Sequence, residues 1–160
     1  MNNHKLSKTS FLLGVNCVKA LYLKQNSPEL SEDSPEREFI MHKGKEVELV
    51  ARHLFSGGED ISQNGKILGA ELHNITKSVL SKQSAILYEG GFLAENGLFC
   101  MTDILIKGKK KSRLYEIKSS TSIKTTHIFD IGFQYFVIKQ CGYKEPMEVY
   151  IVYLNKEYVR

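Results

Sequence analysis

Apolar residues recur at helical spacing in the first half of the chain. The segment 7–24 begins with the capping residues Ser and Thr and continues with apolar positions three or four residues apart, which predicts one helix. A second helix is predicted from Glu36 onward, because four apolar residues share one helical face: Ile40, Val47, Ala51 and Leu54. Gly57 and Gly58 supply its end, and the segment 69–80 predicts a third, shorter helix.

The period changes to that of β-strands after residue 84. Two β-rich runs lie in the segment 85–106, separated by Glu-Asn-Gly, in which Asn-Gly is a hairpin signal. The segments 113–120 and 147–155 predict two further strands, and helical spacing returns over 125–141. This succession of elements predicts an α/β fold (mixed α+β), with a mixed central sheet of four or five strands flanked by helices.

Composition and cysteine usage are those of one globular domain. The chain has 160 residues, of which 42% are hydrophobic and 25% charged, and its formal charge of +4 permits a polyanionic partner. Three widely spaced cysteines without a Cys-x-x-Cys pair predict small buried residues in a reducing cytoplasm. Asn16 and Lys19 interrupt the first apolar run, so neither a signal peptide nor a membrane span is predicted. Because the chain ends at Arg160 directly after a predicted strand, we expect the single domain 1–160 to be followed by further domains.

Charged residues stand in two segments that otherwise have the pattern of core strands. Residues two apart on a strand point the same way, so Glu116 and Lys118 share one face. A hairpin through the lysine-rich turn KGKKKS would bring Asp103 beside Glu116. A buried or edge ion pair is the common explanation of such a pattern. Two neighbouring carboxylates also suit Mg²⁺ or Mn²⁺, which take hard oxygen ligands and cancel the repulsion.

The order of Asp103, twelve residues, Glu116, Ile117 and Lys118 resembles the PD-(D/E)XK nuclease superfamily. The resemblance is closer to its RecB-like branch, which includes the CRISPR-associated exonucleases with an iron–sulfur cluster. SKTSFLLGVNCVKALYL is similar to the opening helix of that branch and GKEVELVARHLF to its Gly-x-x-x-His segment. YEGGF, TDILI, YEIKSSTSIK and HIFDIGFQYFV follow the order of its glutamate, aspartate, Glu-x-Lys and glutamine segments. The most similar group comprises bacterial multidomain proteins in which such a module precedes a large domain of unknown function.

The resemblance implies a restriction-endonuclease-like core and a role for each matched residue. Asp103 and Glu116 would be metal carboxylates, the carbonyl of Ile117 a further ligand, and Lys118 the catalytic lysine. Gln134 matches the helix motif that positions the substrate phosphate or the lysine. Helical spacing places His127, Asp130 and Gln134 in one polar stripe. This stripe either borders the site or is a solvated helical face.

Two departures from the branch affect the predicted cofactors. Glu48 stands at the fifth position from Gly44, where the branch has a metal-binding His, and a carboxylate also suits Mg²⁺. On a helical wheel Glu48 lies at the edge of the apolar stripe and Glu46 points away, so Glu48 is the predicted ligand, with a solvent-exposed glutamate as the alternative. Cys17 matches only the first of four cluster cysteines, so we expect Mg²⁺ or Mn²⁺ and no iron–sulfur cluster in this chain alone.

The segment from Lys107 to Lys124 contains seven cations and one anion, so its net positive charge exceeds that of the whole chain. Lys and Arg bind a phosphate backbone without regard to sequence, whereas a solvated hairpin tip is the alternative. Five residues are predicted to bind nucleic acid: Lys109, Lys110, Lys111, Arg113 and Lys124.

These features predict a metal-dependent deoxyribonuclease of the exonuclease type, acting on single- or double-stranded DNA in the cytoplasm without membrane association. The alternative is a nucleic-acid-binding or scaffold module of a larger protein, with weak or absent catalysis. A third possibility is an unrelated fold in which the charged residues form only ion pairs.

Overall fold

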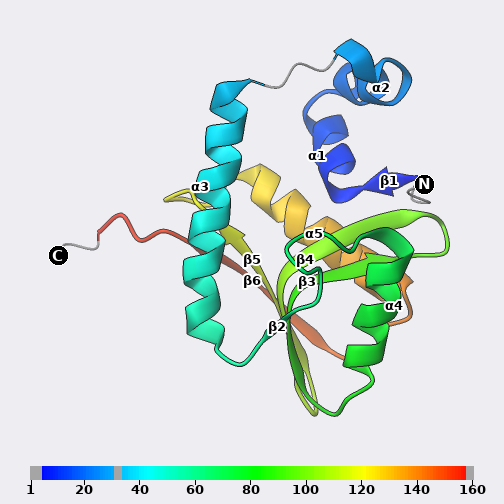
Figure 1. Cartoon of the computed structure of the whole chain (residues 1–160), viewed down its shortest axis with the longest axis vertical. Helices are drawn as coiled ribbons and strands as arrows, with labels where there is room; N and C mark the ends of the chain where they lie inside the picture. Colours follow the sequence, from blue (N-terminus) through cyan, green and yellow to red (C-terminus); the bar gives the residue numbers. More distant parts are fainter. Residues whose placement is uncertain (1–4, 31–33, 158–160) are drawn as a thin grey trace.

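The computed structural model describes residues 5–30 and 34–157, in which five α-helices and six strands follow one another (Figure 1). The helices are α1 (Lys8–Asn16), α2 (Val18–Asn26), α3 (Pro35–Arg52), α4 (Gly69–Leu80) and α5 (Thr125–Gln140). The strands are β1 (Leu6–Ser7), β2 (Glu59–Asp60), β3 (Ala85–Leu93), β4 (Leu98–Lys107), β5 (Ser112–Lys118) and β6 (Met147–Tyr153). Short 3₁₀ helices cover Pro28–Leu30 and His53–Phe55.

The strands form one mixed sheet in the order β2-β3-β4-β5-β6, and β1 pairs with β4 off this path. The β3–β4 and β4–β5 pairs are antiparallel, whereas β5 and β6 are parallel and joined through α5. The expected α/β fold, with a mixed sheet flanked by helices, is confirmed. The four long strands lie where the sequence predicts strands. β1 and β2 were not predicted, because two residues are too few to show a strand period.

Two separate hydrophobic cores lie on the two faces of the sheet. The larger contains Leu72 of α4 and Val137 of α5 together with Leu114 of β5. The smaller contains Ala51 of α3 and Ile117 of β5. Since residues alternate between the faces of a strand, Glu116 and Lys118 point to the α5 side, like Leu114. This alternation sets the position of the charged residues predicted on β5.

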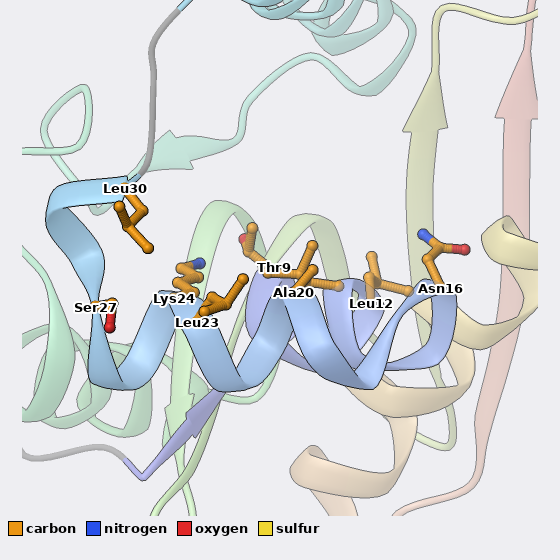
Figure 2. Close-up of a pocket in the computed structure, with 9 residues that line it drawn as sticks. Thr9, Leu12, Asn16, Ala20, Leu23, Lys24, Ser27 and Leu30 are labelled. Atoms are coloured by element: carbon orange, nitrogen blue, oxygen red, sulfur yellow. The ribbon is translucent and has the colours of Figure 1, made fainter.

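The predicted single helix over residues 7–24 is wrong, because the chain forms two helices there. Cys17 between them is extended, with φ −159° and ψ 109°, and the chain folds back so that α2 lies beside α1 (Figure 2). Gly14 permits this approach, since a Cβ at that position would lie 2.8 Å from Cδ2 of Leu21. Leu12 of α1 and Leu23 of α2 line one groove between the two helices, so apolar residues recur at helical spacing on both sides of the break.

The predicted apolar stripe of α3 is only partly confirmed. Val47 and Ala51 pack on the sheet, but Ile40 and Leu54 are 66% and 74% exposed. The N-terminal part of α3 extends beyond the sheet (Figure 1), and Leu54 lies after the helix in the 3₁₀ segment, where the period of 3.6 no longer applies. Across residues 5–30 and 34–157, neither α3 nor any other helix has the length and apolarity needed to cross a bilayer.

The remaining elements agree closely with the predictions. α4 has the predicted bounds, and Gly97 adopts a φ of +85° in the turn between β3 and β4, as the Asn-Gly signal requires. α5 ends at Gln140, just before Gly142, whose φ is +81°.

Candidate functional site

The β4–β5 hairpin brings Asp103 and Glu116 together. Ile104 pairs with Tyr115, so Asp103 is the next residue of β4 and lies opposite Glu116 of β5. The Asp103 carboxylate accepts a hydrogen bond from the Ile117 backbone N–H, with an N···Oδ2 distance of 2.6 Å. The Asp103 carboxylate thus takes the place of a backbone carbonyl acceptor at the point where the regular β4–β5 pairing ends. The predicted juxtaposition of these residues is confirmed, and their role stays a prediction.

Glu116 is the centre of a buried polar network on the α5 side of the sheet. Its side chain is almost fully buried, and Lys118 Nζ donates to its Oε1 at 2.5 Å. Gln134 Nε2 donates to its Oε2 at 2.5 Å, while Lys8 Nζ lies 3.4 Å from both oxygens. Gln134 and Lys118, both predicted site residues, therefore meet on Glu116.

Asp130 is a second carboxylate of this network. Lys118 Nζ donates to its Oδ2 at 2.5 Å, Gln134 Nε2 donates to its Oδ1 at 2.9 Å, and Lys8 Nζ lies 3.4 Å from Oδ1. Asp130 and Gln134 are both buried, so the alternative of a solvated face is wrong for these two. His127, the third member of the stripe, is half-buried and accepts a hydrogen bond from the Lys124 backbone N–H at 3.2 Å.

Periodicity explains how local sequence positions these groups. Asp130 and Gln134 are four residues apart on α5 and so lie on one helical face, between the apolar residues Ile131 and Val137 that pack into the core. Glu116 and Lys118 are two apart on β5. Lys8 comes from a distant part of the sequence, and no periodic signal connects it to the site.

The network changes the protonation behaviour of its members. Burial raises the pKa of Asp103 to about 8, and the negative charges of Glu116 and Glu48 act in the same direction. Burial opposes the ionisation of Asp130, but the charges of Lys8 and Lys118 outweigh it and lower the pKa of Asp130 to about 2. The same carboxylates raise the pKa of both lysines against the effect of burial. Asp103 is thus the carboxylate that the existing cations compensate least.

A second ionic cluster lies between α3, β2 and β3. Arg52 Nη2 binds Glu48 Oε1 at 2.6 Å and Glu89 Oε1 at 3.2 Å, and Arg52 Nη1 binds Asp60 Oδ2 at 3.0 Å. Lys45 Nζ pairs with Glu89 at 2.5 Å and with Glu48 at 3.1 Å. One member of this cluster interacts with Asp103, because the negative charge of Glu48 contributes to the raised pKa of Asp103. The cluster therefore borders the predicted site.

Glu89 has an unusual backbone conformation opposite Asp103. Tyr88 pairs with Ile104 and Gly90 with Thr102, so Glu89 stands across from Asp103 without joining the regular ladder. Its φ is +56°, which is uncommon for a residue other than glycine. Strict alternation would place Glu89 on the face of Leu87, yet its carboxylate binds Lys45 and Arg52 of α3. The local distortion thus coincides with a carboxylate directed to the other face.

Glu48 and Glu46 lie on different sides of α3, as the helical wheel predicts. Glu48 is half-buried and bonded to Arg52 and Lys45, whereas Glu46 is exposed and pairs with Lys43 at 2.8 Å. The alternative of a solvent-exposed glutamate is therefore wrong for Glu48. Its assignment as a metal ligand stays a prediction.

The five predicted nucleic-acid-binding residues do not form one surface. Lys109 and Lys110 are exposed in the β4–β5 turn, and Lys111 and Arg113 beside it pair with Glu148 of β6, at 2.6 and 3.4 Å. Lys124 lies between the end of β5 and the start of α5, whereas the basic turn precedes β5. An antiparallel hairpin carries its turn away from the residues where its pairing ends, so the basic turn lies away from Asp103 and Glu116.

The cysteines are less uniform than expected. Cys100 is buried and Cys141 is half-buried, but Cys17 is exposed, because it lies at the break between α1 and α2. The prediction of three buried cysteines is therefore wrong for Cys17. The expectation that this chain alone carries no iron–sulfur cluster stays a prediction.

Sequence reasoning missed three cations of the two clusters: Lys8, Lys45 and Arg52. Glu89 was matched to the glutamate segment YEGGF but was given no partner. Asp60 was also missed, and Asp130 was assigned only to the polar stripe. The Arg52 and Glu48 pair, four residues apart on one helix, had a usable sequence signal. Lys8 and Asp60 had none, since their partners are brought together only by the sheet and its covering helices.

An apolar groove lies outside this site, between α1 and α2 (Figure 2). It has a volume of about 470 Å³ and is lined mainly by aliphatic residues, including Leu12, Leu23 and Leu30. In the part of the chain that the structure describes, no group of three or more His, Cys, Asp or Glu side chains is arranged to hold a metal ion.

No protein-family model matches the chain, and comparison with curated proteins finds no match. The resemblance to the PD-(D/E)XK nucleases therefore rests on the motif residues and their spacing.

Proposed function

We propose that this protein is a Mg²⁺- or Mn²⁺-dependent nuclease that hydrolyses phosphodiester bonds of DNA. One observation carries the proposal. Asp103 and Glu116 meet on adjacent strands, and Lys118 shares the face of Glu116, with its ammonium 2.5 Å from that carboxylate. This is the arrangement that the Asp and Glu-x-Lys spacing requires.

The charges of the two clusters fit a divalent cation. Within residues 5–30 and 34–157, the clusters contain six carboxylates: Asp103, Glu116, Asp130, Glu48, Asp60 and Glu89. They contain four cations: Lys8, Lys118, Lys45 and Arg52. Fully ionised, they have two negative charges in excess. Asp103 forms no ion pair with any described residue, and its pKa is raised mainly by burial and further by the charges of Glu116 and Glu48.

The residues that would hold the cation are Asp103, Glu116 and the carbonyl of Ile117, with Glu48 as a further carboxylate. All four groups offer hard oxygen atoms, which Mg²⁺ and Mn²⁺ prefer. When bound there, the cation would polarise a phosphate oxygen and lower the pKa of a water molecule. Asp103 accepts a hydrogen bond from the backbone N–H of Ile117, the residue whose carbonyl would be a ligand.

The protein's own groups supply orientation and charge. Lys118 can stabilise negative charge that develops on the phosphate, because its ammonium is held on the same strand face as Glu116. Gln134 holds Glu116 and Asp130 in place through its amide nitrogen and so acts as a positioning residue. The exposed Lys109 and Lys110, together with Lys124, would contact the phosphate backbone of DNA at some distance from the reacting bond.

One observation favours a second candidate, a nucleic-acid-binding or scaffold module without catalysis. Lys8 and Lys118 already pair with Glu116 and Asp130 in a buried setting, as they would in a purely structural network. A scaffold accounts for Asp103 by the hydrogen bond that it accepts from the Ile117 N–H, whereas the nuclease adds a cation beside this carboxylate, so metal binding at Asp103 distinguishes the candidates.

The test is cleavage of labelled single- and double-stranded DNA with Mg²⁺ or Mn²⁺. We expect cleavage by the wild type, its loss in Asp103→Asn and Glu116→Gln, and a decrease of roughly 10²-fold or more in Lys118→Met. Glu46→Gln is the matched control, since Glu46 is an exposed carboxylate outside both clusters. Tight Mn²⁺ binding without cleavage of any substrate would favour the scaffold, and cleavage that survives both carboxylate changes would place the site elsewhere.

A further inference from the structure

Lys8 reaches the carboxylate site beside a stretch of β4 that pairs with neither β1 nor β5. Along one edge of β4, residues 98–99 pair with β1 and residues 104–107 pair with β5. Lys8 directly follows β1, and its Nζ lies between Glu116 and Asp130, with side-chain exposure of 20%. A lysine 108 residues away from Glu116 therefore faces the same carboxylates as Lys118.

The helix itself does not favour a lysine at this position. Lys8 is the first residue of α1, after the Ser7 cap, and no acidic residue lies in the first turn. A cation at a helix N-terminus opposes the helix dipole. The compensating interactions come from Glu116, Asp130 and Asp103, whose negative charges favour the charged form of Lys8.

Every oxygen of Glu116 already has two nitrogen neighbours. Oε1 faces Lys118 at 2.5 Å and Lys8 at 3.4 Å, and Oε2 faces Gln134 at 2.5 Å and Lys8 at 3.4 Å. A cation bound to either oxygen must displace one of these donors. Lys8 is the most weakly held of these donors, because its Nζ lies farthest from the carboxylate oxygens and is shared among three of them, two of Glu116 and one of Asp130.

We propose that Lys8 is a built-in counter-ion that exchanges with the divalent cation at Glu116. This inference rests on the proposed function, because it assigns Lys8 a role at the same metal-binding carboxylates. The exchange requires only a side-chain movement. α1 itself stays anchored, since Phe11 stacks on Phe133 of α5 with a centroid distance of 4.5 Å and Ser7 caps the helix. Lys8 thereby sets the metal affinity of the site.

The first test is calorimetric titration of Mn²⁺ into the folded chain and its Lys8→Met variant. Methionine keeps the apolar stem and removes the charge, so we expect Mn²⁺ binding about tenfold tighter or more, because a positive charge beside the ligand opposes cation binding. Lys8→Arg keeps the charge and should bind no tighter than the wild type. Lys19→Met is the matched control, since it removes one lysine from the exposed surface of α2 and should leave the affinity unchanged.

The outcomes separate this inference from the proposed function. Tighter binding by Lys8→Met without DNA cleavage by any form would support the exchange and overturn the nuclease. Equal or weaker binding by Lys8→Met would overturn the exchange alone, provided that the wild type binds Mn²⁺. Binding by Lys8→Met but not by the wild type would support the exchange in its strongest form. Absence of binding in both folded proteins would overturn the exchange and the metal-dependent function together.

A second test uses the wild type and so does not depend on the folding of a variant. In NMR spectra with ¹⁵N-labelled lysine side chains, the Lys8 ammonium protons should be protected from exchange with water. Saturating Mg²⁺ should bring their exchange to the rate of exposed Lys19, while Lys118 remains protected. Mg²⁺ binding that leaves the Lys8 signal unchanged would overturn the exchange.

Discussion

The two ionic clusters use different cations and differ in what they can do. In the cluster on α3, one guanidinium binds three carboxylates, and Arg52 also lies over the Tyr88 ring with a centroid distance of 4.8 Å. In the cluster on α5, two ammonium groups divide among Glu116 and Asp130. A planar, permanently charged guanidinium suits a fixed framework, whereas a lysine on a flexible stem can leave its partner. We therefore expect the α3 cluster to hold its elements in a fixed arrangement, and the α5 cluster to exchange its lysine for a bound cation.

The clusters also differ in burial. The side chains of Glu116 and Asp130 are 3% and 4% exposed, whereas those of Glu48, Asp60 and Glu89 are 13% to 20% exposed. Charge removal in a buried network leaves a partner charge that water cannot solvate. Equivalent substitutions should therefore cost more on the α5 side.

The largest expected effect is that of Glu116→Gln on stability. The change leaves Lys8 and Lys118 with Asp130 as their nearest carboxylate, so we expect a loss of about 3 kcal/mol or more in the free energy of unfolding. Glu89→Gln removes a more exposed carboxylate and should cost about 1 kcal/mol. Urea unfolding at pH 7 measures both. Equal losses would abolish the proposed contrast between the clusters.

The next effect is a pair of opposite pH dependences. The pKa of Asp130 is lowered in the folded state, so its contribution, on the order of 2 kcal/mol, is present above about pH 4 and lost as the pH falls towards 2. Asp130→Asn should therefore destabilise the protein at pH 6 and have little effect near pH 2.

Asp103 has a raised pKa, so its ionisation opposes folding as the pH rises from about 4 to 8. Asp103→Asn should stabilise the metal-free protein more at pH 8 than at pH 5. Thermal unfolding between pH 2 and pH 8 checks both variants, Asp130→Asn and Asp103→Asn. A pH dependence of the same sign for both would contradict the distinction between the compensated and uncompensated carboxylates.

A smaller effect concerns metal binding at the border of the two clusters. If Glu48 is a ligand, Glu48→Ala should weaken Mn²⁺ binding by about tenfold or more. Glu46→Ala on the exposed side of α3 should leave it unchanged. Calorimetry on both variants compares them directly, and equal effects would remove Glu48 from the site.

The smallest effect is expected for Lys45→Met in the α3 cluster. The Lys45 side chain is 40% exposed, and Arg52 still binds both of its partners, Glu48 and Glu89. We expect a change below about 1 kcal/mol in the free energy of unfolding. A loss as large as that of Glu116→Gln would show that Lys45, and not Arg52, holds the cluster together.

The sequence by itself determined the class of fold, the four long strands and the pairing of Asp103 with Glu116. These features depend on local periodicity and on one short turn, so neighbouring residues contain the necessary information. It also placed Gln134 on the face of α5 that holds Asp130, because residues four apart on a helix are neighbours.

Strand alternation already placed Lys118 beside Glu116, but only the tertiary structure decided which distant cations compensate the carboxylates. The short β1 pairing and the packing of Phe11 of α1 on Phe133 of α5 position Lys8 beside Glu116, and neither leaves a periodic signal. Glu89 reaches α3 through a positive φ that strand alternation does not predict. The physical reason is the same in each case. Ion pairs between distant segments depend on where the packed elements place long side chains, and residue spacing contains no information about that placement.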